Sequence, residues 1–369
     1  MAEGDIRRVA IVGAGNGGCA AAVDLTRRGF EVRLCGRSAA TIAPLQARGG
    51  IEHEGVLGDG FTPIAAITTD TGTAIRGSDA VLVMGPTQAH RDMAQAIAPH
   101  LEPSQVFFAA PGHTLTLLAH TLREAGHRRP VTCESSTLPY ICRKVTNERV
   151  KVSRRAAKLS FAAFPATRTA ELAARLTPLF PALSPVGSLL DTVFPYTNAI
   201  HHPPALLCNI GRVESTGGDY CHYYDGITPS VGRIIDALDG ERRAVAAAFG
   251  CHVESLPEYF FQLGYTDEHG RAGGTAYSTF HNSEPNRWIK APASVDHRFF
   301  NEDIPYGLVP LTELGRLAGI ALPACHAVIA LASIAAGQHY DKAGLTLQRM
   351  GIAGLTIAEL KTLLARGYD

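Results

Sequence analysis

The chain has 369 residues, which is more than one ordinary hydrophobic core accommodates and therefore predicts two domains. Its 34 basic residues balance its 34 acidic residues, so the net charge gives no sign of nucleic acid or of an anionic membrane as a partner. The eight cysteines are dispersed without a CxxC pair or a zinc-ligand spacing, which predicts no metal site and reduced thiols, as in a cytoplasmic enzyme.

A glycine-rich loop near the start of the chain lies between a strand pattern and a helix pattern. Residues 9–12 form a short β-branched run, residues 13–18 read Gly-Ala-Gly-Asn-Gly-Gly, and residues 19–25 are apolar and compatible with a helix. This order favours a dinucleotide-binding fold over an ordinary glycine turn, because the glycines permit a tight turn, a close pyrophosphate and a closely packed helix. The phosphates would face the unpaired N–H groups of that helix. We assign five loop residues to the cofactor: Gly13, Gly15, Asn16, Gly17 and Gly18.

Further strands alternate with helices through the first half of the chain, which predicts an α/β fold with a doubly wound parallel sheet. The predicted strands are residues 31–35, 80–84, 105–110 and 131–134. Ligands of such sheets bind beyond the carboxyl ends of the strands. We therefore expect Pro86 to contact the cofactor, and His113 and Tyr140 to line the substrate pocket.

The end of the second predicted strand indicates which nicotinamide cofactor is bound. NAD-dependent enzymes usually carry an acidic residue there, whereas this chain has Gly36-Arg37-Ser38. The Arg37 guanidinium could bind a 2′-phosphate and stack on adenine, and the Ser38 hydroxyl could add a donor. We therefore favour NADP(H), with NAD(H) as the alternative cofactor and a solvated surface arginine as the alternative role for Arg37.

The pattern becomes helical after Pro185. We assign residues 1–185 to a Rossmann-type NAD(P)-binding domain and residues 186–369 to a mainly α-helical substrate and catalytic domain. Thr228 and Pro229 predict the start of a helix that continues to Gly250.

Two later segments of this second domain have contrasting patterns. Residues 264–303 are rich in Gly, Asn, Ser and His and predict a long irregular loop of the kind that forms lids or binding segments. A helical pattern resumes over residues 310–337, whose most apolar part is too short to span a bilayer.

Histidine is the natural proton carrier of the second domain. No lysine occurs between Lys158 and Lys290, so the central helices cannot supply a lysine acid–base group. On a helix, Asn198 and His202 lie one turn apart on the same face, which places Asn198 beside the substrate that His202 would act on. The neighbouring His201 leaves the identity of the active ring open. A buried, hydrogen-bonded structural histidine is the alternative interpretation.

Several separated motifs occur together in this chain. They are Thr137-Leu138-Pro139-Tyr140 with Cys142-Arg143, Asn198-x-x-x-His202-Pro203, Asn209-x-Gly211-Arg212-x-Glu214 and Arg298-x-x-x-Glu302-Asp303-Ile304-Pro305-Tyr306-Gly307. With the glycine loop, and in this order over most of the chain, they resemble the opine dehydrogenases, that is, the octopine/nopaline dehydrogenase family.

The resemblance implies an activity and several residue roles. Members of this family join the amine of an amino acid to a 2-oxo acid such as pyruvate and reduce the imine with NAD(P)H. By the resemblance, His202 is the acid–base residue, Asp303 is its partner and Arg298 binds a carboxylate. Cys142 falls where the family has a pocket residue near the nicotinamide or substrate. The chain departs from the family pattern at His113, where glutamine is more frequent.

Other functions stay open on the sequence alone. One is a different NAD(P)-dependent reduction of a 2-oxo or hydroxy acid that involves no amine, and another is a non-catalytic NADP-binding sensor. Arg298 could equally form a surface ion pair, and Asp303 could cap a helix. The expected partners are an amino acid and a 2-oxo acid, without nucleic acid or membrane, and an apolar helical domain is compatible with a homodimer.

Overall fold

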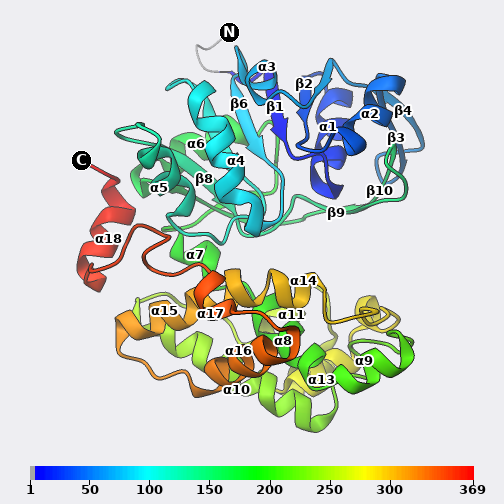
Figure 1. Cartoon of the computed structure of the whole chain (residues 1–369), viewed down its shortest axis with the longest axis vertical. Coiled ribbons are helices and arrows are strands. Elements are labelled where there is room, and N and C mark those ends of the chain that lie inside the picture. The colour runs from blue at the N-terminus through cyan, green and yellow to red at the C-terminus, as the bar shows by residue number, and fades with distance from the viewer. Residues whose placement is uncertain (1–4) are drawn as a thin grey trace. The chain divides into compact units, whose positions relative to one another are not determined.

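The computed structural model describes residues 5–369, and residues 1–4 of the predicted first domain lie outside the described residues. The chain divides into two compact units (Figure 1). The first contains the chain up to Val193 together with Ala358–Asp369, and the second contains Phe194–Ile357. The division therefore falls shortly after the boundary that the sequence predicted at residue 186.

The first unit is built around an eight-stranded sheet, which confirms the predicted α/β fold. Its strands are β1 (Arg8–Val12), β2 (Glu31–Cys35), β5 (Ala66–Thr68), β6 (Ala80–Val83), β7 (Val106–Ala109), β8 (Thr132–Ser135), β11 (Leu159–Phe164) and β12 (Leu183–Pro185). They lie in the order β12-β11-β8-β7-β6-β1-β2-β5. Neighbouring strands run parallel except at the antiparallel β8–β11 pair.

Helices cover both faces of this sheet because alternate residues of its strands are buried on opposite sides. Val9 and Ile11 of β1 pack into a core with α1 (Asn16–Arg27) and α6 (Thr169–Leu176). Ala10 and Val12 pack into a second core. The helices that contribute to this second core are α3 (Thr71–Ile75), α4 (His90–Ile97) and α5 (Leu117–Glu124).

A second, smaller sheet belongs to the same unit and was not predicted. Its strands are β3 (Gly50–Gly55), β4 (Gly60–Pro63), β9 (Tyr140–Lys144) and β10 (Arg149–Arg155), in the order β4-β3-β10-β9. The remaining helical segments of the unit are α2 (Ala39–Arg48), α7 (Leu190–Val193), and the short turns η1 (Thr87–Ala89), η2 (Ala98–His100) and η3 (Ala166–Arg168). Strand β9 packs against α1, which brings the segment that starts at Tyr140 next to the glycine loop's own helix.

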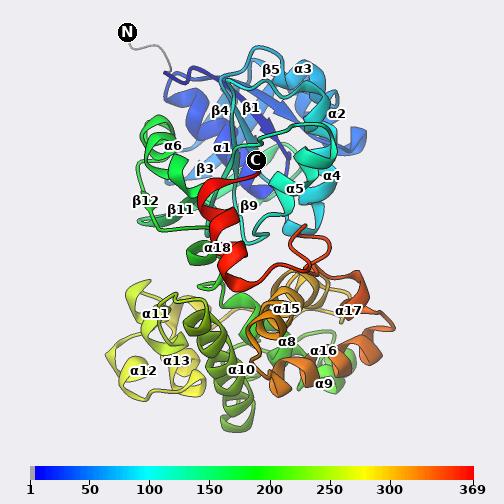
Figure 2. The same cartoon turned by 90° about the vertical axis from the view of Figure 1, so that its left-hand side faces the viewer.

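The second unit is helical, as predicted. Its elements are α8 (Asn198–Leu207), α9 (Ile210–Thr216), α10 (Pro229–Ala248), α11 (Leu256–Gln262), α12 (Glu268–Ala272), α13 (Ala276–His281), η4 (Glu284–Asn286), α14 (Arg298–Asn301), η5 (Ile304–Leu308), α15 (Val309–Ala318), α16 (Pro323–Ala336) and α17 (Tyr340–Ala343). The long helix α10 packs against α8, α13, α15 and α16 (Figure 2). Thr228 caps α10 by accepting the N–H of Val231, so the predicted start of this helix is confirmed.

The predicted irregular loop over residues 264–303 is wrong in part, because it contains three short helices, α12, α13 and α14. These helices are too short to show an apolar period and depend on local caps instead. In α13, Thr275 and Ser278 form a reciprocal capping box, and Asp267 caps α12. Trp288 in the same segment is 70% exposed.

The end of the chain corrects the predicted extent of the second domain. From Ala358 onward, helix α18 (Ile357–Arg366) groups with the first unit (Figure 2). Tyr368, which follows the helix, belongs to the same unit. The centroids of the Tyr368 and Phe164 rings are 5.2 Å apart, and the central carbon of the Arg123 guanidinium lies 4.2 Å from the Tyr368 ring centroid. The sequence analysis did not predict that the end of the chain rejoins the first unit, because an amphipathic helix does not reveal which core buries its apolar face.

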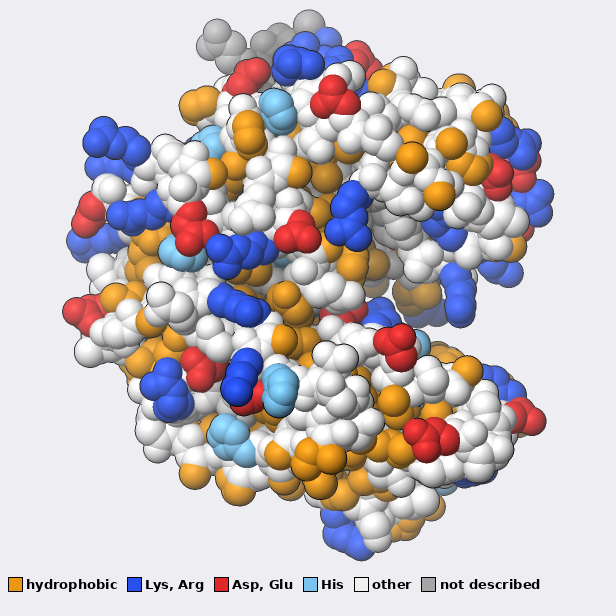
Figure 3. All heavy atoms as spheres, viewed as in Figure 1, with side chains coloured by type: hydrophobic (Ala, Val, Ile, Leu, Met, Phe, Trp, Pro, Cys, Tyr) orange, Lys and Arg blue, Asp and Glu red, His pale blue; other side chains and the backbone are white. Residues whose placement is uncertain are grey.

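The surface agrees with the balanced composition. On the face shown in Figure 3, Lys and Arg side chains are interspersed with Asp and Glu. Among residues 5–369, no helix combines the length and the apolar character that crossing a bilayer requires.

Candidate active site

The glycine loop has the backbone geometry of a phosphate-binding turn. Gly13 has a φ of +118°, and a Cβ there would lie 2.3 Å from the carbonyl oxygen of Met84. A Cβ at Gly18 would lie 1.6 Å from the carbonyl oxygen of Gly13. A Cβ at Gly15 would meet no atom of the described residues beyond its chain neighbours within 4 Å, so the N-cap of α1 borders open space. These residues fit the pyrophosphate of a dinucleotide at the positive end of α1.

Asn16 and Gly17 hold this loop in place. The Asn16 side-chain oxygen accepts the backbone N–H of Lys144 at 2.8 Å. A Cβ at Gly17 would lie 2.7 Å from the Leu138 side chain. The Asn16 hydrogen bond therefore fastens the start of α1 to β9, and the absence of a side chain at Gly17 leaves room for Leu138.

Lys144 is a candidate cofactor contact that the sequence analysis missed. Its ammonium donates to the Ala14 carbonyl oxygen at 3.4 Å, which places a positive charge beside the glycine loop. A cation here would complement the anionic phosphates of a dinucleotide. Nothing in a single sequence links residues so far apart, because the contact depends on the unpredicted packing of β9 on α1.

The residues assigned to the 2′-phosphate lie at the surface after β2. The Arg37 side chain is 89% exposed and only 3.8 Å from Asp92, and such an exposed ion pair contributes little stability. Ser38 occupies the N-cap position of α2, but its side chain makes no capping hydrogen bond. Both polar groups are therefore presented to solvent. Pro86 is exposed as well, at the start of η1 after β6.

His113 lies in a strained turn that a buried acid supports. Its φ is +62°, a conformation that costs a non-glycine residue about 1 kcal/mol or more. The His113 backbone N–H donates to Glu134 at 3.2 Å, and the Thr192 hydroxyl donates to the same carboxyl oxygen at 2.5 Å. A Cβ at Gly112 would lie 2.3 Å from this carboxyl group. Glu134, at the end of β8, thus fixes the turn that the sequence assigned to the pocket.

Glu134 should make the folded protein less stable as the pH rises. Burial raises the pKa of Glu134 from 4.5 to about 7, so between these values the folded protein keeps a proton that the unfolded chain releases. The shift corresponds to about 3 kcal/mol of stability that is present below pH 4.5 and lost as the pH rises through 7. Glu134→Gln should therefore raise the melting temperature more at pH 8 than at pH 5. Equal changes at the two pH values would contradict this assignment.

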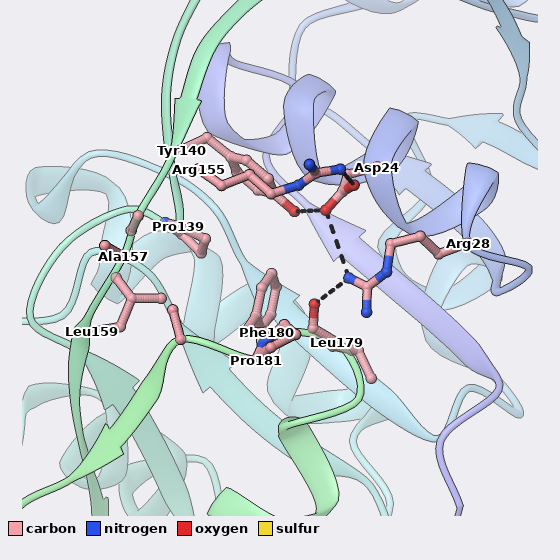
Figure 4. A pocket seen from close by; sticks show the side chains of 12 residues that line it. Asp24, Arg28, Pro139, Tyr140, Arg155, Ala157, Leu159, Leu179, Phe180 and Pro181 are labelled. Atoms are coloured by element: carbon pink, nitrogen blue, oxygen red, sulfur yellow. Dashed lines mark hydrogen bonds and ion pairs between the residues drawn. The ribbon is translucent and has the colours of Figure 1, made fainter. Parts of the chain in front are cut away.

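Tyr140 makes a buried hydrogen bond beneath α1. Its hydroxyl donates to Asp24 at 2.8 Å, and Arg155 binds the other carboxyl oxygen of Asp24 at 2.6 Å (Figure 4). Asp24 lies about 12 Å along α1 from Asn16. Tyr140 and Asp24 border a separate cavity of about 470 Å³ within the first unit, together with Arg28 and Phe180. The second sheet turns the Tyr140 ring under α1, and its contact with substrate stays a prediction.

Cys142 has a similar environment. Its side chain is partly buried against the core that α1 shares with the sheet. Burial raises the pKa of the thiol to about 12, which keeps it protonated. The structure thus places Cys142 in the packing of β9 on α1, and its role beside the nicotinamide or substrate stays a prediction.

The second unit brings together His202 and Asp303, which are far apart in sequence. His202 lies in α8, whose residues 199–206 are all buried, and Asp303 immediately precedes the π-helical turn η5. Their Nδ1 and Oδ2 atoms are 2.8 Å apart. Since a carboxylate only accepts hydrogen bonds, Nδ1 is the donor, which leaves Nε2 as the acceptor in the neutral ring. Turns of this π-helical kind are frequent at functional sites.

The environment sets the protonation of this pair. Burial, with Arg298 and His297 nearby, lowers the pKa of His202 well below 6.5, so the ring is neutral at pH 7. Burial raises the pKa of Asp303 to about 6, against the opposing effect of Arg298. At neutral pH the pair is therefore a neutral imidazole oriented by a carboxylate, the protonation state in which a histidine can act as a base.

His201 differs from His202 because no acidic side chain among residues 5–369 pairs with its ring. Its ring packs against Phe260 at 5.6 Å and Phe280 at 5.1 Å. Burial lowers its pKa well below the usual value. The geometry thus favours His202 as the ring with a fixed tautomer, which the sequence left open.

Arg298 and Asn198 lie near the pair with exposed polar groups. Arg298 begins α14, is half exposed and binds Glu302 through Nε at 3.1 Å. Its positive charge and the Tyr196 hydroxyl, which donates to Asp303, stabilise the Asp303 carboxylate. Asn198 begins α8, one turn before His202, and is partly exposed.

Tyr223 completes this arrangement and was not identified from the sequence. Its hydroxyl lies 2.8 Å from Nε2 of His202. It belongs to the segment between α9 and α10, where no motif points to His202. Asn209, which the sequence motifs did include, indicates this segment indirectly. Its side-chain amide donates to the Gly226 carbonyl and so anchors the segment that contains Tyr223.

Two family descriptions match the chain. Residues 185–336 match the NAD/NADP octopine/nopaline dehydrogenase α-helical domain, and residues 8–112 match the N-terminus of NAD-dependent glycerol-3-phosphate dehydrogenase. The chain is 27% identical to vitopine synthase of Allorhizobium ampelinum, over 94% of this chain and 96% of that protein. It is 33% identical to an opine dehydrogenase of Arthrobacter sp., over 96% of this chain and 97% of that protein.

Solved structures share the fold. Octopine dehydrogenase with NADH and L-arginine superposes with a TM-score of 0.79 at 21% identity, covering 96% of this chain and 98% of that one. NADP⁺-bound yersinopine dehydrogenase gives a TM-score of 0.73 at 13% identity, covering 99% of both chains. Because its 33% identity to an opine dehydrogenase extends over nearly the whole of both sequences, this chain belongs to the opine dehydrogenase family of NAD(P)-dependent oxidoreductases.

Proposed function

We propose that the protein condenses the amine of an amino acid with a 2-oxo acid of the pyruvate type and reduces the imine with NADPH, giving an N-(carboxyalkyl) amino acid. The reverse oxidation uses the same groups. The observation that carries this proposal is the buried His202–Asp303 pair at 2.8 Å, a neutral base with a fixed tautomer. Imine formation requires such a group, because the amine must lose a proton before it attacks and the carbonyl oxygen must gain protons before it leaves.

The roles of the chain's residues follow from this chemistry. His202 takes a proton from the substrate ammonium and returns one to the departing hydroxyl, while Asp303 stabilises the imidazolium that forms in between. Arg298 holds the carboxylate of the 2-oxo acid, since its guanidinium can form two parallel hydrogen bonds. Asn198 is positioned beside His202 to orient the substrate. The bound nicotinamide supplies the hydride.

The ligands bound in related solved structures support this substrate class. Octopine dehydrogenase was solved with NADH and pyruvate and, separately, with NADH and L-arginine. We extend to this protein the combination of an amino acid and a short 2-oxo acid.

We propose NADPH as the preferred cofactor, with NADH as a weaker one. The support is the exposed Arg37 side chain and the Ser38 hydroxyl, which makes no capping hydrogen bond to α2. Both follow β2, where an acidic residue would favour NADH. Arg37→Asp should weaken NADPH binding at least about tenfold by replacing attraction to the 2′-phosphate with repulsion, and should leave NADH binding within about twofold. Fluorescence titration of both cofactors measures this. An equal loss for NADPH and NADH would contradict the assignment.

The direct test is NADPH oxidation with pyruvate and each amino acid in turn. We expect consumption only when both substrates are present, with a secondary amine as the product. Consumption with the 2-oxo acid alone would instead indicate a ketone reductase. Tight cofactor binding without turnover on any pair would indicate a sensor.

Location and assembly are part of the proposal. All eight cysteines are free thiols, which supports the cytoplasm as the place of reaction. A homodimer is supported by apolar residues exposed on α16, where Leu331 is 56% and Ile334 is 78% accessible.

A further inference from the structure

Neither ring nitrogen of His202 is left without a partner in the described part of the chain. Nδ1 donates to Asp303, and Nε2 lies 2.8 Å from the Tyr223 hydroxyl. One face of the imidazole is covered by the Phe299 ring, stacked at 3.9 Å with 22° between the planes. A proton can therefore reach Nε2 only through Tyr223, or after Tyr223 has moved away.

Tyr223 is held too firmly for movement to be the simpler route. Its ring stacks on Phe280 at 5.1 Å, with only 7° between the planes, and its side chain is buried. The Ile227 N–H donates to the Tyr223 carbonyl at 3.1 Å. Asn209 donates to both Gly226 and Ala205 at 2.9 Å, which fastens the Tyr223 segment to the helix that carries His202.

The other titratable groups around Tyr223 do not compete for its proton. His201 and His222 have ring centroids 6.1 Å and 4.8 Å from that of Tyr223. Burial lowers the pKa of both rings, so they stay neutral at pH 7. Burial and the nearby Asp303 raise the pKa of Tyr223, so its hydroxyl remains protonated and can donate. Arg298 opposes this effect without reversing it.

We propose that Tyr223 is a catalytic residue that passes protons between Nε2 of His202 and the reacting nitrogen and oxygen of the condensing substrates. This inference rests on the proposed function. The supporting observation is that the Tyr223 hydroxyl lies at Nε2 of His202, which is the hydrogen-bonding position left on the imidazole once Nδ1 has bound Asp303.

The proton transfers balance over the condensation. The Tyr223 hydroxyl gives its proton to Nε2 as its oxygen accepts one from the substrate ammonium, which leaves a neutral amine and an imidazolium paired with Asp303. The amine attacks the carbonyl carbon, and Tyr223 moves a second proton from the nitrogen to the oxygen. Finally, Tyr223 donates to the hydroxyl while Nε2 restores the phenol, so that the C–O bond breaks, water leaves and an iminium remains for the hydride.

Tyr223→Phe tests this relay because it removes the hydroxyl and keeps the ring that stacks on Phe280. We expect kcat to fall at least about a hundredfold, the scale of one lost acid–base contact, with cofactor affinity within about twofold. The matched control is Tyr220→Phe, since the buried Tyr220 hydroxyl has no hydrogen-bond partner within residues 5–369. The control should retain wild-type kcat.

A purely structural role for Tyr223 predicts a different result. If the hydroxyl only fixes the tautomer, its removal frees Nε2 for the substrate, and kcat should stay within about threefold of wild type. That outcome would overturn the relay. A fall confined to KM, with kcat unchanged, would overturn it as well.

Two further measurements separate the relay from a folding defect. Replacing Tyr223 by a fluorinated tyrosine keeps the ring and the hydroxyl but makes the phenol more acidic, so kcat and its pH profile should shift. An unshifted profile would count against proton transfer. ¹⁵N NMR of the histidines should show the Nε2 signal of His202 change in Tyr223→Phe but not in Tyr220→Phe, a readout that needs no turnover. A wild type that forms no secondary amine would refute the proposed function, whereas an unchanged Nε2 signal would refute the Tyr223 contact.

Discussion

His202→Ala should lower kcat at least about a thousandfold while leaving the affinity for NADPH within about twofold, because acid–base groups contribute about 10² to 10⁴ to such rates. His202 is a base that is paired with a buried carboxylate. Its Nδ1 atom lies 2.8 Å from Oδ2 of Asp303. Its loss removes both the acceptor for the ammonium proton and the donor for the departing water. NADPH oxidation under saturating substrates, with cofactor binding measured separately, tests the result.

The neighbouring histidine provides the control. His201→Ala removes a buried ring of the same size from the adjacent position of α8, so it reproduces the packing loss without touching Asp303. We expect it to lower the melting temperature but to keep kcat within about tenfold, the margin left for indirect effects. If His202→Ala and His201→Ala lost activity equally, His202 would have no special role.

Asp303→Asn should also lower kcat about a thousandfold or more, because an amide can present its N–H to Nδ1 and favour the wrong tautomer of His202. In the wild type, the pKa of Asp303 is about 6, so the carboxylate that orients His202 is lost as the pH falls below this value. The wild-type rate should therefore decline below about pH 6, and Asp303→Asn should lack this acidic limb. An acidic limb that persists in Asp303→Asn would remove Asp303 from the mechanism.

Local patterns in the sequence predicted those parts of the fold that local contacts build. The shape of the glycine loop was predicted from the sequence because its tightest contact is local: a Cβ at Gly18 would meet the backbone of Gly13 within the strand–turn–helix unit itself. Helix α10 was predicted because its cap is local. The Thr228 side chain accepts the N–H of Val231, which lies three residues further along the chain. The pairing of His202 with Asp303 joins residues of two distant segments, so its prediction required the family resemblance and not the spacing.

Long-range packing accounts for the parts that were missed. The small sheet that packs Tyr140 and Cys142 against α1 was not predicted, because a polar, alternating strand such as β10 gives a weak signal. Glu134 and Lys144 act through contacts that only the assembled first unit creates. Tyr223 has no neighbouring motif, since its role depends on the turn that brings its hydroxyl to His202.

The most direct test of the central claim, that a C=N bond is reduced, follows the hydride itself. NADPH that carries deuterium at the transferring carbon of the nicotinamide is incubated with the protein, pyruvate and an accepted amino acid, and the product is examined by mass spectrometry and NMR. We predict one deuterium on the former carbonyl carbon of a secondary amine, in equal amount to the NADPH consumed. Deuterium found instead in a 2-hydroxy acid, with the amino acid unchanged, would contradict the account.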